Sequence, residues 1–366
     1  MLLSSFTASK NNISISNLSI TYGVVLGIGF SLVYTPSLVI LGHYFEKRLG
    51  VVNGIVTSGS SVFTVFLPIF LPPLFTTYGV RTTFQILSAM VFVLILCSLT
   101  FAEKPKDDIE VVDNDELEKI CITKETVTAR RRGLINGGIW RNKMYILWVT
   151  AIPIALFGYF VPYAYLPEHV KQILPGYNSD LLVTFIGAFS GIGRLVFGKI
   201  SDYPQINSVI LQQVAFIAIG TLTVLLVFPK AYVVFIILCC GFGLFDGCFI
   251  SLIGPIAHKI VGQRDASQAI GFLLGFCSIP LTIGPPLAGY LYDLNGNYIL
   301  AFILSGVPPF IGALLMLPIL RQQRREEKMH KFASSSKEST ETKSEDANYF
   351  DDKIKVQSSE EQKTIV

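Results

Sequence analysis

Long apolar stretches with few or no charged residues constrain the fold of this chain more than any other feature of its sequence. A hydrocarbon core about 30 Å thick takes roughly 20 helical residues to cross, and the sequence offers about nine stretches of that length. They lie near residues 20–42, 51–75, 82–102, 144–166, 181–201, 208–229, 232–257, 266–290 and 299–320. Composition agrees, since 51% of the 366 residues are hydrophobic, 15% are charged and the mean hydropathy is +0.55. The sequence therefore predicts an all-α polytopic membrane protein.

Charged segments divide the chain into regions. Residues 103–143 are rich in acidic and basic side chains and predict a linker that separates three spans from six. From about residue 332 the chain is rich in Ser, Glu and Lys without apolar periodicity, which predicts a disordered tail. The predicted organisation is a helical region over 1–102, the linker 103–143, a second helical region over 144–320 and the tail 321–366.

Basic residues fall mostly on one side of the membrane if the spans simply alternate. That side receives the basic residues of the linker and tail together with Lys47, Arg48, Lys199, Lys259 and Arg264. The other side receives Arg81, Lys171 and Lys230. Because cytoplasmic loops are enriched in Lys and Arg, the linker and the C-terminal tail are predicted to be cytosolic.

Two charged residues lie well inside predicted spans, where a charge facing lipid costs several kcal/mol. They are Arg194 in the fifth span and Asp246 in the seventh. One interpretation is a buried ion pair that only locks two helices together. The other is a cavity in which the guanidinium receives a substrate carboxylate, while Asp246 balances its charge or meets a substrate amino group.

The fourth predicted span is dense in aromatic residues. Tyr159 and Tyr163 are four residues apart, so a continuous helix would place them on one face. They could line a cavity for a flat aromatic solute, although for any single aromatic residue here interface anchoring or lipid-facing packing is the better account.

Signals for other classes of protein do not stand out. The sequence contains no Walker loop, HExxH motif or serine triad, so it predicts no enzyme. The six cysteines lack the spacing of a metal site or a disulfide framework. The small net charge of +3 implies no nucleic-acid partner.

Several stretches resemble the monocarboxylate transporter family of the major facilitator superfamily. They are YTPSLVILGHYFEKRLGVVNGIVTSGSSVF at 34–63, FIGAFSGIGRLVFGKISD at 185–202, GLFDGCFISLIGPIAHKIVG with ASQAIGFLLG within 243–275, and IGPPLAG at 283–289. The amino-acid sequence of the first stretch, together with Asp246 and the ASQAIG run, most resembles the branch that moves thyroid hormones and aromatic amino acids. The resemblance extends from about residue 3 to residue 320.

The resemblance implies a fold of twelve helices in two six-helix bundles joined by a cytosolic loop. The three-plus-six pattern then corresponds to helices four to six and seven to twelve, with residues 1–10 similar to the end of helix three. On this alignment the chain lacks the first three helices of the family. Residues 1–102 would be the remainder of the N-terminal bundle, and residues 144–320 would form the C-terminal bundle.

The resemblance also implies roles for particular residues. Arg194 matches an arginine that engages substrate carboxylate, and Asp246 matches an aspartate that the hormone branch couples to it. Ser190 stands where proton-coupled lactate carriers have an aspartate, which argues against proton coupling through that position. Tyr165 stands where the hormone branch has a histidine, and with Tyr159 it is a candidate substrate residue. A loop and gating motif would contain Lys47, Arg48, Asn53 and Gly54.

The predicted function is facilitated movement of an aromatic amino acid or iodothyronine-like hormone across the plasma membrane by alternating access, without a cofactor. One alternative is a proton-linked carrier of short monocarboxylates. Another is a membrane protein that does not transport. The expected partners are a small organic acid or amino acid and the lipid bilayer. Some family members use a single-span ancillary subunit, and no residue of this sequence decides whether this chain does.

Overall fold

The computed structural model describes residues 19–45, 48–98, 137–263, 265–323 and 325, and every regular element in this part of the chain is helical. The elements are η1 (Ser19–Val25), α3 (Leu26–Tyr44), α4 (Leu49–Ser98), η2 (Gly137–Arg141), α6 (Lys143–Ala155), α7 (Val161–Ile173), α8 (Asp180–Ser201), α9 (Ser208–Leu225), α10 (Tyr232–Val261), α11 (Ala266–Asn295) and α12 (Ile299–Leu315). All of them belong to a compact unit that ends at Met316, and a second unit begins at Leu317. The chain is an all-α polytopic membrane protein, as predicted.

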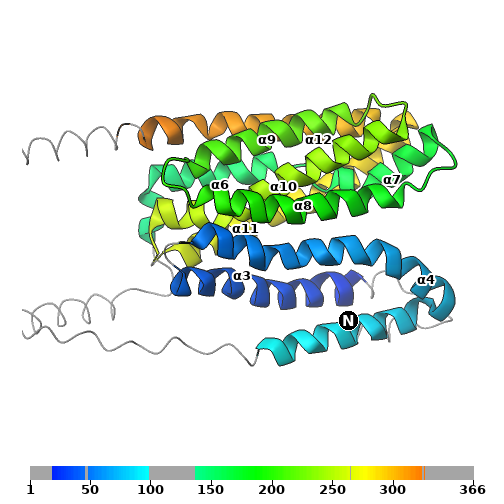
Figure 1. Cartoon of the computed structure of the whole chain (residues 1–366), viewed down its shortest axis with the longest axis horizontal. Helices are drawn as coiled ribbons and strands as arrows, with labels where there is room; N and C mark the ends of the chain where they lie inside the picture. The colour runs from blue at the N-terminus through cyan, green and yellow to red at the C-terminus, as the bar shows by residue number, and fades with distance from the viewer. Residues whose placement is uncertain (1–18, 46–47, 99–136, 264, 324, 326–366) are drawn as a thin grey trace, which may run out of the picture. The chain divides into compact units, whose positions relative to one another are not determined.

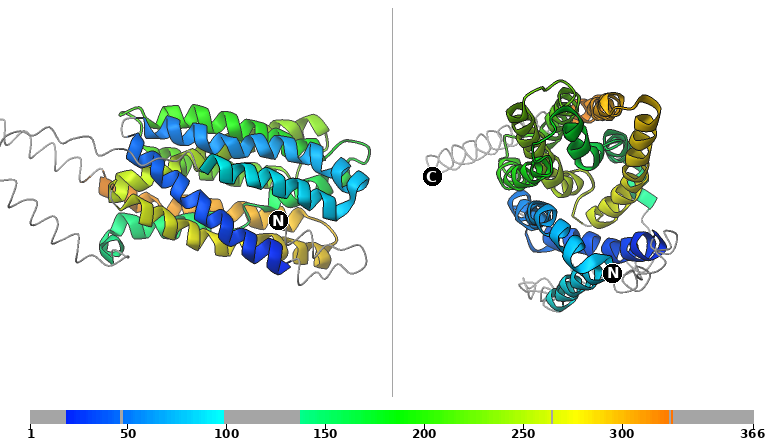
Figure 2. Two further views of the ribbon diagram at one scale, coloured as in Figure 1. Left: turned by 90° about the horizontal axis from the view of Figure 1, so that it is seen from below. Right: turned by 90° about the vertical axis from the view of Figure 1, so that its right-hand side faces the viewer.

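Helix length and apolarity support the predicted membrane spans. Among the described residues, 6 helices are long and apolar enough to cross a membrane, and shorter apolar helices cover Gly23–Leu38 and Lys143–Ala155. The predicted spans correspond to α3, the two parts of α4, α6 together with α7, and α8 to α12. Figure 2, viewed end-on, shows α3 and α4 in blue and cyan on one side of the green-to-orange helices.

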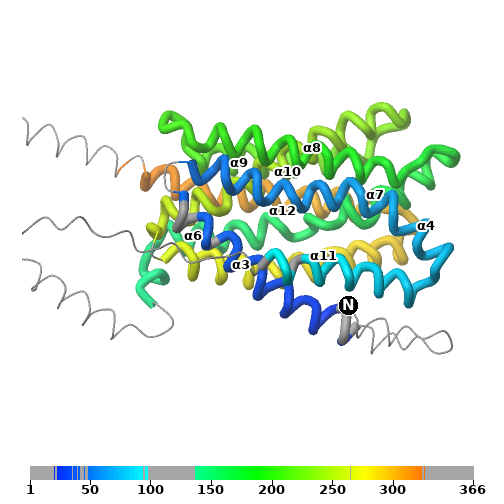
Figure 3. The backbone as a smooth tube through the Cα atoms, turned by 60° about the horizontal axis from the view of Figure 1, so that its bottom comes forward, coloured from blue at the N-terminus to red at the C-terminus, as the bar shows by residue number. Residues whose placement is uncertain are grey.

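The continuous element α4 contains two spans. Its backbone is non-helical at Gly79, where φ is 75° and ψ is 170°, a conformation that glycine adopts without the steric cost of a Cβ atom. The chain turns back on itself there, as the tube in Figure 3 shows. The predicted separation of 51–75 from 82–102 is therefore confirmed.

The predicted span over 144–166 is not one continuous helix. α6 ends at Ala155 and α7 begins at Val161, and turn hydrogen bonds link the residues between them. Gly158 lies in this break with φ +88° and packs against Ser305 of α12, where a Cβ would lie 2.6 Å from the Ser305 side chain. Pro162 lacks a backbone donor and suits the first turn of the new helix α7. Hydrophobicity alone did not reveal the break because the residues on both sides of it are apolar.

Glycines bring α8 into close contact with its neighbours. α8 lies between α10 and the first part of α4 (Figure 1). A Cβ on Gly193 of α8 would overlap the backbone of Leu244, and one on Gly247 of α10 would overlap the carbonyl of Ser190. On the other side of α8, a Cβ on Gly54 of α4 would overlap the Arg194 carbonyl. Small residues at helix contacts are typical of membrane bundles, and here they bring the two intramembrane charges together.

Candidate substrate site

α8 and α10 hold the two charged residues that the sequence singled out. The Arg194 side chain reaches Asp246 with 4.0 Å between Nη2 and Oδ2. Both residues are buried, with relative exposures of 6% and 1%. The contact follows from helix spacing, because Gly193 and Gly247, each next in sequence to one of the two charges, let the backbones of α8 and α10 touch.

Hydroxyl groups satisfy the Asp246 carboxylate from two directions. Ser190, one turn before Arg194 on α8, donates a hydrogen bond of 2.6 Å to Oδ2. The Tyr159 hydroxyl, from the break between α6 and α7, donates to Oδ1. The carboxylate therefore does not depend on a close ion pair with Arg194 for its hydrogen bonds.

The Arg194 guanidinium donates hydrogen bonds to α4 from one side and makes no close hydrogen bond on the other. Its Nη1 donates to the backbone carbonyl of Thr57 and to the Ser60 hydroxyl. Its Nε is buried and has no hydrogen-bond partner among the described residues, while Nη2 reaches Asp246 only at 4.0 Å. Guanidinium groups bind carboxylates through two parallel hydrogen bonds, and the Nε and Nη2 edge of Arg194 is the side that makes no close hydrogen bond to the described residues.

A cavity of about 470 Å³ adjoins this arginine. Arg194 contributes the only charged side chain among the lining residues, and α6, α10 and α11 add apolar ones. The aromatic residues that line it are Tyr34, Tyr159, Phe160, Tyr163 and Phe249. Tyr159 lies 5.8 Å from Tyr163 between ring centroids and 6.3 Å from Phe249. The cavity thus combines one cation with an aromatic wall, while Asp246 lies behind Tyr159 and outside the lining.

Tyr165 lies elsewhere. Its hydroxyl donates to the carbonyl of Pro285 at 2.9 Å, and its ring stacks on Tyr298 with 5.2 Å between centroids. It does not line the cavity beside Arg194. Two residues beyond Tyr163, it points to a different side of α7, so the structure brings together Arg194, Asp246 and Tyr159 but not Tyr165.

The predicted gating motif lies at the start of α4 and contacts the other helices. Lys47 falls outside the described residues, and Arg48 is exposed. The Asn53 side chain is buried and donates to the carbonyl of Ser251 on α10 at 2.8 Å. Gly54 contacts the backbone of Arg194. Asn53 and Gly54 therefore belong to the surface of α4 that packs on α8 and α10.

Asp202, at the end of α8, caps the start of α4. Its two carboxylate oxygens accept hydrogen bonds from the backbone N–H groups of Gly50 at 2.7 Å and Val51 at 2.9 Å. The first N–H groups of a helix have no partner within the helix and favour negative charge. Nothing in the sequence indicated this partner of Asp202, which is 152 residues away in the chain. Thr57, Ser60 and Tyr34 were missed for the same reason.

Comparison with known proteins establishes the class. The model of the Major Facilitator Superfamily matches residues 1–245 and 213–350. The chain belongs to this superfamily of membrane proteins.

Within the superfamily, the resemblance to monocarboxylate transporters is confirmed. The chain is 46% identical to monocarboxylate transporter 10 of Rattus norvegicus over 318 residues, which is 86% of this chain and 62% of the relative. It is 43% identical to monocarboxylate transporter 10 of Homo sapiens, covering 86% and 61%. It is 28% identical to monocarboxylate transporter 4 of Gallus gallus, covering 86% and 64%. The chain spans less than two thirds of the length of these relatives.

Proposed function

We propose that this chain carries the substrate site of a facilitative transporter for carboxylate-bearing organic solutes, with aromatic amino acids or iodothyronines as the substrates. The observation that carries the proposal is a buried arginine that lines an aromatic cavity and whose Nε and Nη2 edge makes no close hydrogen bond to the described residues. A substrate carboxylate would bind this edge, and its ring would pack against Tyr159, Tyr163 and Phe249. The resemblance to the thyroid hormone and aromatic amino acid branch supports the same substrate class.

Alternating access accounts for the contacts between α4 and the helices of the second region. Asp202 caps α4, Asn53 bonds to α10, and Arg194 bonds to α4 through Thr57 and Ser60. Arg194 would therefore belong both to the substrate site and to the contact that separates when the bundles rock. The proposed location is the plasma membrane, with residues 103–143 and 321–366 in the cytosol.

The alternatives make different use of the same residues. A proton-linked monocarboxylate carrier would need a titrating acid beside Arg194 on α8, and Ser190 offers a hydroxyl there that donates to Asp246 instead. A purely structural ion pair would favour a closer contact than 4.0 Å and a hydrogen-bond partner for the buried Nε of Arg194. A membrane protein without transport activity remains the rival from a different class, and an uptake assay separates it from a transporter.

The test compares single and double substitutions in cells that express this chain preceded by the three helices that the family resemblance implies, taken from monocarboxylate transporter 10. Arg194→Ala should abolish uptake of labelled phenylalanine or triiodothyronine while the protein still reaches the surface, and Arg194→Lys should restore little, because an ammonium lacks the fork of donors. The double variant Arg194→Ala with Asp246→Ala should reach the surface and remain inactive. Saturable uptake by the double variant would contradict the proposed role of Arg194 and favour a structural ion pair.

A further inference from the structure

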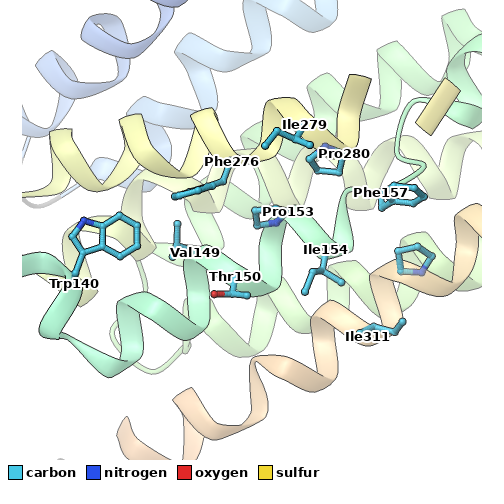
Figure 4. A pocket seen from close by; sticks show the side chains of 11 residues that line it. Trp140, Val149, Thr150, Pro153, Ile154, Phe157, Phe276, Ile279, Pro280 and Ile311 are labelled. Atoms are coloured by element: carbon cyan, nitrogen blue, oxygen red, sulfur yellow. The ribbon is translucent and has the colours of Figure 1, made fainter. Parts of the chain in front are cut away.

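A second large cavity lies on the other face of α6 and α11. It has a volume of about 520 Å³ and forms an open apolar groove between η2, α6, α11 and α12 (Figure 4). Trp140 lies at one end, Val149 and Pro153 contribute from α6, Phe276 from α11 and Ile311 from α12. Thr150 supplies the only hydroxyl among the residues that line it. The site described above includes none of these residues.

The groove faces away from the Arg194 cavity. Ile152 and Cys277 line the Arg194 cavity from α6 and α11, whereas Pro153 and Phe276, their neighbours in the sequence, line the groove. Phe276 and Ile311 are each 44% exposed, which is unusual for large apolar residues of a water-exposed surface but expected where hydrocarbon covers them. The groove is therefore open to the membrane.

Basic residues mark the Trp140 end of the groove. Arg141 and Lys143 are exposed and flank Asn142, whose side chain caps α6 by accepting from the backbone N–H of Met144 at 3.0 Å. No acidic residue occurs between residues 137 and 150. Trp140 packs edge-on against Phe272 at 5.3 Å and Phe276 at 6.0 Å, so an indole of the kind enriched at membrane interfaces forms the rim.

We infer that the groove binds one acyl chain of an anionic phospholipid, with the lipid phosphate at Arg141 and Lys143. The apolar lining suits hydrocarbon, and two exposed basic residues at the rim favour a net negative headgroup. A zwitterionic phospholipid would gain less from these charges, and a sterol would gain nothing from them. The site goes beyond the proposed transport function, because it requires only that the protein lies in a membrane.

The bound chain would support the helix break from behind. Phe157, within the break, lines the groove, while Tyr159, two residues later, lines the Arg194 cavity and bonds to Asp246. Only the segment around residues 157–159 therefore separates the groove from the Arg194 cavity here.

The two tryptophans of the chain provide the measurement. Trp140 lines the groove, whereas Trp148 is fully buried and donates to the Gln212 side chain at 3.0 Å. In nanodiscs of the full chain, phosphatidylglycerol with brominated acyl chains should quench tryptophan fluorescence at an about tenfold lower mole fraction than brominated phosphatidylcholine. Trp140→Phe should remove this quenching and leave the shielded emission of Trp148.

Charge substitutions distinguish preferential binding of an anionic headgroup from simple contact with bulk lipid. Arg141→Gln with Lys143→Gln should make the two brominated lipids quench alike. The matched control, Lys199→Gln with Lys230→Gln, removes the same charge from exposed positions elsewhere and should keep the preference. Equal quenching of the unmodified chain by both lipids would overturn the inference. A preference that survives Arg141→Gln with Lys143→Gln would also overturn it. Reversal of quenching by cholesterol would indicate a sterol site instead. Absence of quenching would indicate that a second copy of the chain covers the groove.

Discussion

Two helical segments border the cavity beside Arg194 and hold their polar groups in opposite ways. α8 and α10 are continuous helices in backbone contact, and they carry Arg194 and Asp246. The span formed by α6 and α7 has a helix break at residues 156–160, and this break contains Tyr159. The charges are thus fixed by helices whose spacing glycine sets, whereas the hydroxyl that completes the site comes from a turn. Separating a buried charge from its partners costs more free energy than moving a neutral hydroxyl. The charges accordingly lie on continuous helices, and the hydroxyl lies on a turn.

The largest expected effect comes from separating α8 and α10. Gly247→Val would place a side chain against the backbone of Ser190 and Arg194, and overpacking of this kind costs about 3 kcal/mol. We expect loss of uptake and a clear drop in the thermal unfolding temperature in detergent. Gly241→Ala is the control on the same helix, since its Cβ would meet the Leu222 side chain at an acceptable 3.4 Å. Normal unfolding of the Gly247 variant would show that the helix contact is not tight.

The next effect comes from the hydroxyl in the break. Tyr159→Phe leaves the buried Asp246 carboxylate with Ser190, Tyr163 and the Arg194 guanidinium at 4.0 Å. Losing one hydrogen bond to a charged group costs about 1.5 kcal/mol, or roughly tenfold in uptake. Tyr165→Phe is the matched control, because that hydroxyl bonds to the carbonyl of Pro285 away from the cavity. An equal or larger loss in the Tyr165 variant would restore Tyr165 as a substrate residue.

A smaller effect concerns the break itself. Gly158→Ala adds a Cβ at φ +88° and against Ser305, which should cost about 1–2 kcal/mol in stability. Gly275→Ala, in α11 with no atom within 4 Å of the added Cβ, should be neutral or slightly stabilising because alanine favours helix. Thermal unfolding of both variants in detergent measures the difference. Equal midpoints would mean that the backbone of the break relaxes easily.

The smallest effect concerns proton coupling, for which we expect almost no change in uptake. Because Ser190 occupies the position one turn before Arg194, uptake should change little when an inward proton gradient is imposed. Ser190→Asp would place a second carboxylate beside Asp246, and two close carboxylates tend to share a proton. Uptake by that variant should become dependent on pH. Several-fold stimulation of the unmodified protein by acidification, abolished by a protonophore, would favour the proton-linked alternative.

The sequence by itself determined the membrane class, the approximate position of most spans and the two charged residues inside them. Hydrocarbon imposes these features directly: a span needs a run of apolar residues, and a charge inside such a run is rare enough to stand out. Arg194 and Asp246 could therefore be paired as a hypothesis although 52 positions in the printed sequence separate them. Ser190 was singled out through family resemblance, and its hydrogen bond to Asp246 explains why a hydroxyl suits that position.

The tertiary structure decided which polar groups meet. Tyr159 and Tyr165 are similar in the sequence, yet only Tyr159 reaches Asp246, because the break at Gly158 redirects the chain before α7 begins. Asp202 and Ser60 acquired their roles only when α8 packed against α4. Contacts of this kind depend on helix rotation and on backbone separation, which glycine positions permit but hydrophobic periodicity does not specify. The partners of a buried charge are therefore settled by packing, while its presence is already visible in the sequence.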